Sequence, residues 1–436
     1  MKTLKIGVIL LAFLLAAMAM VPMVSATGQD VTMTPGSDFA NQTMDVTKIQ
    51  VPVLNTDTSQ TPITLTNEMT LDQTTKSLQI TPLAIVAPNQ GPVKIPYGVI
   101  IRHSTDGLTT VFDSTGKQLF SASDSKAALI NTPDGPVPAT HIQEVPDKSV
   151  IVDTGKIIYV FSNKALILTD INEKYGNTNT AVKAAAATSM DFGTTKPYIE
   201  GAETNILPSI GRFTARWNVP KSPVKTQLYP PSGIVSLGSK ITIWNGVTGM
   251  GSDGTLRLLQ PVLEWYVKDN TSDPNPTTPA WTMATWYVGN ASTSDKIHST
   301  RQSLVYSGDT MQGDIQLNTL GYDAIASITD LGYDGGGSST LFLTKTTSPH
   351  RMPSTNVQAT VMLEGWDPTQ LIGLNGQYLC GSTTFQSFVL KDAKGNSILS
   401  TPMNSGVNTN YWNPSTFGLN VENSWPSSIK LDTINN

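Results

Sequence analysis

The sequence contains few of the residues on which disulfide-stabilised or charge-driven proteins depend. Among 436 residues there is one cysteine, Cys380, so no disulfide can form within the chain and stability must come from packing. We expect that thiol to be buried. Only 14% of the residues are charged and the net charge is −5, which leaves no basic surface for nucleic acid or for an anionic membrane.

Long apolar runs are missing after the first residues of the chain. Residues 1–26 carry Lys2 and Lys5, then an apolar stretch, then Val-Ser-Ala, an order typical of a secretory signal peptide. An uncleaved N-terminal anchor is the alternative, because the stretch approaches the roughly 18–20 residues that span a bilayer. We predict a secreted or cell-surface protein that has no membrane contact after signal cleavage.

Local motifs for metal binding and nucleophilic catalysis are also absent. The four histidines are scattered without HExxH spacing, and the sequence has neither a G-x-S-x-G nucleophile elbow nor a phosphate-binding loop. A serine triad could still assemble in space, although nothing local points to one. We therefore predict no metal and no cofactor.

The chain changes character near residue 200, because all eight tryptophans lie beyond it. Residues 27–82 are rich in Thr, Gln, Asn and Asp, and we expect an extended or poorly ordered lead-in there. Short β-branched runs then predict a smaller β-rich N-terminal domain over 83–200, which could serve as a propeptide. Those runs lie at 97–102, 109–112, 149–152 and 157–161. A helix is predicted at 180–188, where a linker or processing site would lie.

The second half of the chain shows only short strand signals separated by Gly, Pro, Asn and Asp. Strands are predicted at 213–219, 240–244, 255–267, 281–288, 311–317, 324–329, 339–343, 357–365 and 382–390. Their close spacing, with no competing helical period, indicates an all-β fold, either an antiparallel sandwich or a barrel, over 207–436.

Two of these strand segments carry carboxyl groups among apolar residues. Side chains two residues apart share a face of a strand, so Gln260 and Glu264 point the same way within 256–267. Within 359–366 one face carries Glu364. A carboxyl beside Trp or Met is partly desolvated, which raises its pKa and suits it to donate and accept protons. The alternative is a hydrogen-bonded glutamate on the solvent face of a half-exposed strand.

The segment Leu-Leu-Gln-Pro-Val-Leu-Glu-Trp at 258–265 resembles the Ile-Leu-Gln-Thr-Gly-(aromatic)-Asp-Trp segment of the eqolisin family of glutamic peptidases. Neighbouring motifs resemble other family segments in the family's order. They are Phe-Thr-Ala-Arg-Trp-Asn-Val-Pro at 213–220, Ile-Trp-Asn-Gly-Val-Thr-Gly at 243–249, Trp-Thr-Met-Ala-Thr-Trp-Tyr at 281–287, Ser-Gly-Asp-Thr at 307–310 and Val-Met-Leu-Glu-Gly-Trp at 361–366. The similarity spans about 210–390 and implies an antiparallel β-sandwich of the concanavalin-like jelly-roll type.

The resemblance also implies roles for individual residues. Gln260 would be the catalytic glutamine, whose amide stabilises the oxyanion, and Glu364 the glutamate that activates water and then protonates the leaving amine. Trp244, Glu264 and Trp286 would line the substrate-binding cleft.

The sequence departs from the family at two points. The family's last strand has two glutamates and this one has only Glu364; if Glu364 matches the second, Thr360 stands at the catalytic position and the chain is no peptidase of this kind. Pro261 follows the glutamine, which predicts a bulge or an edge strand. Neprosin-type peptidases, a related sandwich family that uses two glutamates, are the nearest variant, and Gln260 argues against them.

We predict a secreted, acid-active glutamic endopeptidase that acts as a monomer on polypeptide substrates. The alternative is a non-catalytic, lectin-like binding or adhesion sandwich at the cell surface with an exposed aromatic cleft. Geometry separates the two predictions. The peptidase requires Gln260 and Glu364 to meet across adjacent strands in an open groove, whereas the binding module requires only solvent-exposed tryptophans.

Overall fold

In the computed structural model, all the described residues belong to one compact unit within residues 36–436. The structure describes residues 49, 51–54, 69–72, 77–80, 93–127, 129–132, 135–174, 198–223, 237–251, 255–267, 280–290, 295–319, 321–332, 337–345, 351–365, 379–409 and 414–433. The predicted signal peptide and the predicted helix at 180–188 lie outside these residues, as does much of the predicted lead-in.

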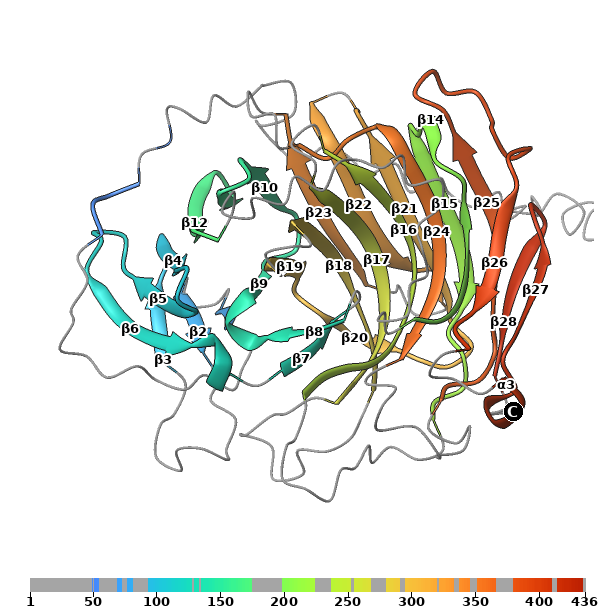
Figure 1. Cartoon of the computed structure of the whole chain (residues 1–436), viewed down its shortest axis with the longest axis horizontal. Helices are drawn as coiled ribbons and strands as arrows, with labels where there is room; N and C mark the ends of the chain where they lie inside the picture. Colours follow the sequence, from blue (N-terminus) through green and yellow to red (C-terminus); the bar gives the residue numbers. More distant parts are fainter. Residues whose placement is uncertain are drawn as a thin grey trace, which may run out of the picture. The chain divides into compact units, whose positions relative to one another are not determined.

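Almost every described element is a strand, and the strands form two sheets (Figure 1). The first sheet has the order β26 (Met403–Val407), β13 (Tyr198–Thr204), β24 (Thr355–Gly365), β16 (Leu237–Met250), β17 (Leu256–Val267), β18 (Ala280–Asn290), β19 (Asp295–Ser299), β9 (Ile142–Val145), β1 (Met69–Asp72), β2 (Ser77–Ile80) and β3 (Val93–Pro96). Off this path, β14 (Leu207–Ser209) pairs with β24, β20 (Gln302–Val305) with β18, and β7 (Leu129–Thr132) with both β16 and β8 (Gly135–Pro138).

The second sheet packs against the first. Its order is β27 (Asn420–Ser424), β28 (Ser428–Asp432), β25 (Thr383–Lys391), β15 (Arg212–Asn218), β21 (Thr310–Leu317), β22 (Tyr322–Asp330), β23 (Ser338–Thr344), β10 (Ser149–Asp153), β11 (Ile157–Ser162), β12 (Ala165–Asn172), β4 (Val99–His103), β5 (Leu108–Phe112) and β6 (Gln118–Ser123). Apolar side chains of both sheets share one buried cluster, for example Ile243 from the first and Phe213 from the second. The prediction of an all-β sandwich is confirmed.

The helical elements among the described residues are short. They are η3 (Asp124–Lys126), η4 (Ala139–His141) and α3 (Pro414–Phe417). Within the described residues, no helix has the length and apolar character needed to cross a membrane. Cys380 is fully buried, as predicted, and burial raises the pKa of its thiol far above the usual range.

Each strand predicted from the sequence is present, and two of the strands that were not predicted have a composition that weakens the strand signal. β13 is Tyr-Ile-Glu-Gly-Ala-Glu-Thr and β26 is Met-Asn-Ser-Gly-Val, and both carry Gly and polar residues that weaken a strand signal. β17 is a central strand, so the bulge or edge position expected from Pro261 is wrong. The β16–β17 ladder leaves out the pairs at Gln260 and Pro261 and resumes in the same register.

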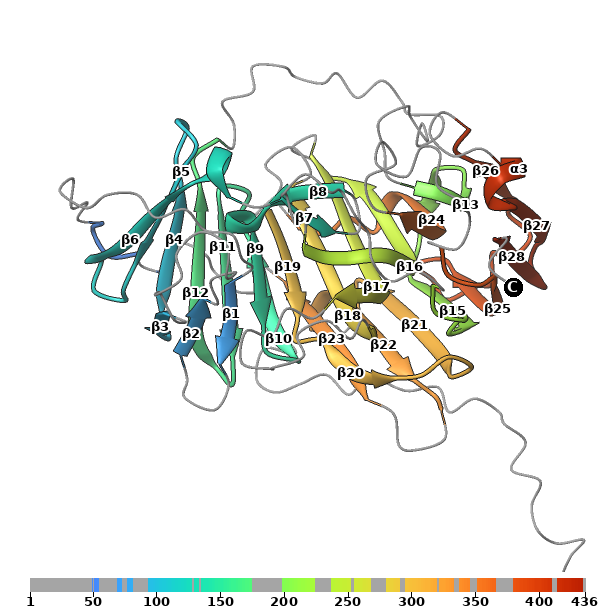
Figure 2. The ribbon, with the colours of Figure 1, turned by 90° about the horizontal axis from the view of Figure 1, so that it is seen from below.

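The N-terminal strands extend both sheets of the sandwich. Strands after residue 198 pair with one another antiparallel, whereas β9 joins β19, β10 joins β23 and β7 joins β16 in parallel (Figure 2). The sheets are therefore mixed at the junction. The largest buried cluster also runs through both parts, since it contains Ile151 and Ile158 as well as Tyr287. The β-rich N-terminal region thus shares a core with the sandwich.

Candidate active site

All five residues singled out from the sequence lie on one face of the first sheet. On β16, Ile241 and Ile243 enter the core between the sheets, so Thr242, Trp244 and Gly246 point to the opposite face. The pairing places Val262 opposite Trp244, Glu264 and Glu364 on either side of Thr242, and Gln260 opposite Trp286. The predicted site residues Gln260, Glu264, Glu364, Trp244 and Trp286 therefore share this face, which we call the tryptophan face.

Two carboxyl groups on the tryptophan face flank Thr242. Glu364 Oε2 accepts hydrogen bonds from Thr242 Oγ1 at 3.1 Å and from Trp244 Nε1 at 2.9 Å. Across Thr242, Glu264 accepts a hydrogen bond from the indole of Trp286 through Oε1. Each glutamate thus accepts a hydrogen bond from one indole N–H. Glu264 lies on β17 and Glu364 on β24, with β16 between these two strands.

Arg301 and His298 complete the surroundings of Glu264. Arg301 Nε donates to Glu264 Oε2 at 2.6 Å, and its guanidinium carbon lies 5.7 Å from the Trp286 ring centroid. The His298 ring is tilted against the Trp286 ring, with centroids 4.3 Å apart. Burial, and after it the charge of Arg301, lower the pKa of His298 to about 3. His298 is therefore neutral above about pH 3, and Arg301 supplies the positive charge beside Glu264.

Gln260 belongs to a second row of residues on the same face. Gly246 separates Gln260 from Thr360, and Thr360 pairs in turn with Glu203 on β13. Neither Gln260 Nε2 nor Oε1 has a hydrogen-bond partner within the described residues, and the same holds for Thr360 Oγ1. Gln260 and Thr360 are both fully buried. Because buried polar groups are almost always paired, the amide and hydroxyl of this row have hydrogen-bonding capacity that the described residues do not use.

The indole of Trp244 lies between the two rows. Its Nε1 bonds to Glu364, whereas a Cβ built on Gly246 would lie 2.7 Å from Cζ3 of the same ring and 3.3 Å from Cγ of Gln260. Glu364 lies in the same row as Glu264, because both pair with Thr242. Glu264 is four residues along β17 from Gln260, so the two rows are about 13 Å apart along the strands at about 3.3 Å per residue. Gln260 and Glu364 share a face but do not meet across adjacent strands in this structure.

The tryptophan face is covered by residues of the N-terminal region. Val137, Ala139 and Ile142 form one buried cluster with Trp244, Val262, Ala284, Trp286 and Met362. Gln260 and Glu264 are 0% exposed and Glu364 is 7% exposed. The open groove and the exposed tryptophans that the two sequence-based hypotheses required are therefore absent from this face in this structure.

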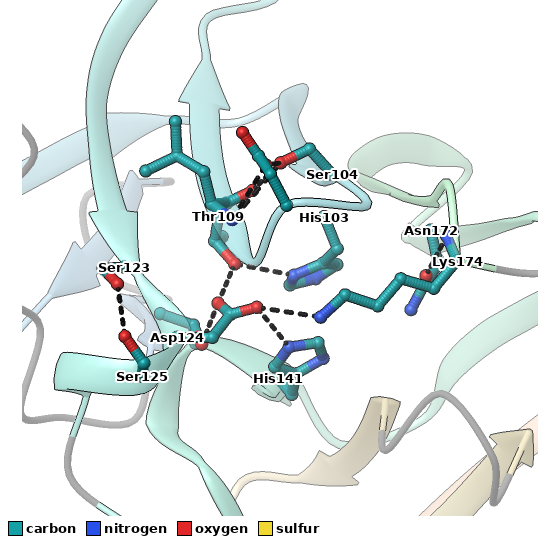
Figure 3. A network of polar contacts seen from close by, with 12 residues as sticks. His103, Ser104, Thr109, Ser123, Asp124, Ser125, His141, Asn172 and Lys174 are labelled. Carbon is teal, nitrogen blue, oxygen red and sulfur yellow. Dashed lines mark hydrogen bonds and ion pairs between the residues drawn. The ribbon is translucent and has the colours of Figure 1, made fainter.

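A separate buried polar network lies in the N-terminal region (Figure 3). Asp124 accepts hydrogen bonds from Thr109 at 2.6 Å, Thr140 at 2.9 Å, His141 Nε2 at 3.1 Å and Lys174 Nζ at 3.2 Å. Burial would raise the pKa of Asp124, but the hydrogen bonds from His141, Thr109 and Thr140 outweigh it and hold that pKa well below its ordinary value. The network ties η4 to η3.

Ligand-type atoms of His103, Asp124 and His141 lie within 4.8 Å of one another, which raises the question of a metal. Both ring nitrogens of His103 are engaged, Nδ1 with Thr109 Oγ1 at 2.8 Å and Nε2 with Asp170 Oδ1 at 3.1 Å. The ammonium of Lys174 already occupies the position of a cation beside Asp124. These side chains fit an internal hydrogen-bond network better than a metal centre.

Several residues of the tryptophan face were not found by sequence reasoning. Thr242, Glu203 and Arg301 carry no motif of their own, and Glu203 lies on a strand that the sequence did not predict. A partial signal was present for Thr242, since it is a polar residue two positions before Trp244 in a β-branched run. Only the pairing of β13 with β24 shows where Glu203 lies, and only the ion pair with Glu264 shows where Arg301 lies.

No protein-family model matches the chain, and no curated protein matches it. Among solved structures it is similar to scytalido-glutamic peptidase bound to a transition-state analogue inhibitor, with 12% identity and a TM-score of 0.34 over 55% of this chain and 98% of that one. It is also similar to the enzymatically active domain of bacteriophage CBA120 tailspike protein 2, with 13% identity and a TM-score of 0.22 over 42% of this chain and 23% of that one.

Proposed function

We propose that the chain is a secreted hydrolase of peptide bonds whose chemistry takes place on the tryptophan face. The observation that supports it best is the buried side-chain amide of Gln260, which has no hydrogen-bond partner within the described residues. This amide lies on the same face of the sheet as the carboxyl of Glu364. A fixed neutral donor in a dry site is suited to stabilise the oxyanion formed when water attacks a carbonyl carbon.

We assign the proton transfers to Glu364. Hydrogen bonds from Thr242 and Trp244 fix its Oε2 atom in place. Glu264 is bonded to the guanidinium of Arg301, so we assign it to holding that arginine. In the reaction, Glu364 would take a proton from water and then give it to the leaving amine.

Two movements must precede catalysis by this pair. The segment that contains Val137, Ala139 and Ile142 must leave the face, because it fills the space that a substrate would use. The indole of Trp244 must also turn away from the space between Gln260 and Glu364, and both side chains must extend toward one scissile bond across the roughly 13 Å between their rows. The chain as described is a closed form of the enzyme.

The test is hydrolysis of an unfolded protein across about pH 2–8, after a low-pH incubation that permits processing. Glu364→Gln should abolish hydrolysis, and Gln260→Ala should reduce it by about 100-fold or more, the usual effect of removing an oxyanion donor. The exposed Glu422→Gln is the matched control and should keep full activity. The proposal is refuted if the wild type is inactive throughout or if both site variants cleave like the wild type.

Glu203→Gln belongs in the same series. Glu203 lies in the row of Gln260, next to Thr360, where the sequence left the position of the catalytic glutamate open. Loss of hydrolysis in Glu203→Gln together with activity in Glu364→Gln would move the acid and base role to Glu203. The opposite pattern supports Glu364.

A further inference from the structure

The segment 135–145 crosses the tryptophan face as two short strands, β8 and β9, joined by the single turn of η4, and both ends are held by strand pairing. At one end β8 pairs with β7, which pairs in parallel with β16. At the other end Ile142 to Val145 pair in parallel with β19. Between β16 and β19 lie β17 and β18, the strands that carry Gln260 and Trp286. The segment therefore runs over the strands that carry the candidate site (Figure 2).

Side chains of the segment divide between the face and the N-terminal region. Val137, Ala139 and Ile142 enter the cluster that contains Trp244 and Trp286. Thr140 and His141, between them, turn to Asp124 instead. The positions of the segment that touch the tryptophan face thus carry aliphatic side chains. The polar positions Thr140 and His141 instead bind the segment to Asp124 of the N-terminal region.

The charged edge of the face also has a partner in the segment. Arg301, which is bonded to Glu264, lies 3.7 Å from Glu144 Oε2 through its Nη1 atom. Glu144 follows Ile142 by two residues, so its carboxyl lies where the apolar contact ends. The segment matches the face in shape, in apolar side chains and in charge.

We propose that the tryptophan face is a binding site for polypeptide segments with small aliphatic side chains and a following acidic residue, and that segment 135–145 is its resident occupant. The inference rests on the proposed function, for which it names the substrate class. An incoming chain would pair with the edge of β19, which β9 now occupies, and insert aliphatic side chains beside Trp244 and Trp286.

The experiment displaces the resident segment in the full chain and offers the same segment as a free peptide. Ala139 is fully buried, so Ala139→Glu places a carboxylate in the apolar cluster and should expel the segment. A fluorescein-labelled peptide with the sequence of 135–145 is then titrated by fluorescence polarisation. It should bind the Ala139→Glu protein at least about tenfold more tightly than the wild type, whose face is occupied.

The matched control is the same peptide carrying Ala139→Glu, which should bind the variant protein at least about tenfold more weakly than the unmodified peptide. Val137→Lys displaces the other end of the segment and is the second variant if Ala139→Glu does not fold. The inference is overturned if a folded variant with displaced segment binds neither peptide, or binds both equally.

Glu364→Gln in the Ala139→Glu background separates this inference from the proposed function. Peptide binding should persist in the double variant. Binding without hydrolysis in any form of the protein would leave a polypeptide-binding face and refute the enzyme. Hydrolysis without peptide binding would refute this inference alone.

Discussion

Glu200 is a buried carboxyl group whose protonation should make the stability of the protein depend on pH. It lies on β13, opposite Leu363 of β24 and Val407 of β26, and is 0% exposed. Burial, together with the nearby charge of Asp432, raises the pKa of Glu200 from 4.5 to about 9. The backbone amide of Asn420 offsets part of it. At neutral pH the folded protein therefore holds a proton that the unfolded chain releases.

The sign and size of the effect follow from that difference. Because the folded pKa is raised, the contribution is present in full below about pH 4.5 and is lost progressively as the pH rises through the folded value of about 9. Each unit corresponds to about 1.4 kcal/mol, so about 4 kcal/mol is lost between about pH 4.5 and about pH 7.5. Glu200→Gln removes the ionisation and should remove this slope.

The assay is urea denaturation of wild type and Glu200→Gln at intervals from about pH 4.5 to about pH 8.5. Asp323, whose pKa burial raises to about 6, and other buried aspartates add slopes of the same sign, so the informative quantity is the difference between the two proteins. The variant should gain stability relative to wild type as the pH rises, whatever constant cost its amide imposes. Glu422→Gln, at an exposed glutamate, should leave the slope unchanged. Parallel curves for wild type and Glu200→Gln would refute the reasoning.

Three further substitutions test other parts of the structure. Arg257→Met leaves Asp153 buried without its ion-pair partner at 3.4 Å and should lower the free energy of unfolding, measured by urea denaturation, by about 3–5 kcal/mol. Asp153→Asn in the same protein should restore part of that loss. A loss below about 1 kcal/mol would contradict the contact. Gly246→Ala places a methyl group 2.7 Å from the Trp244 ring and should destabilise the folded protein by about 1–3 kcal/mol. The control is Gly406→Ala, whose methyl group meets nothing within 4 Å. Equal effects of the two substitutions would count against close packing at Gly246. Asp124→Asn should destabilise the protein near neutral pH. Because the pKa of Asp124 is lowered in the folded protein, the difference in stability from the wild type should shrink as the pH falls below about 4. A stability difference that does not depend on pH would argue against an ionised Asp124 in the network.

The strands of the sandwich could be predicted because their sequences are unambiguous at short range. Runs such as Ile157 to Phe161 combine β-branched and aromatic residues and are bounded by turn residues. The pairing of β9 with β19 and of β10 with β23 could not be predicted, because a parallel contact between distant segments leaves no local periodicity. For the same reason the continuity of the N-terminal region with the sandwich could not be foreseen.

The sequence could predict that the candidate residues of one strand share a face of the sheet. It could not predict the register, that is, which residues of neighbouring strands lie opposite one another. Alternation along a strand places Gln260 and Glu264 on one side from the sequence alone. Which residue of β24 lies across from Gln260 depends on pairing through β16, and that pairing places Thr360 in the row of Gln260 and Glu364 in the row of Glu264. A four-residue displacement leaves the motif similarity unchanged but decides which groups can act on one bond.

The shared core between the two parts of the chain also limits how the tryptophan face can be uncovered. Asp153 of β10 accepts hydrogen bonds from Arg257 at 3.4 Å and from the hydroxyl of Tyr287 at 2.6 Å, and Arg257 and Tyr287 are fully buried residues of the sandwich. Removing the whole N-terminal region would expose an unpaired arginine and a large apolar surface together. Lifting the segment 135–145 from the face disturbs its own cluster, the pairing of β8 with β7 and of β9 with β19 and β1, the ion pair of Glu144 with Arg301 and the Asp124 network. Local opening of that segment therefore costs far less free energy than release of the region, and we expect access to the face to be gained in that way.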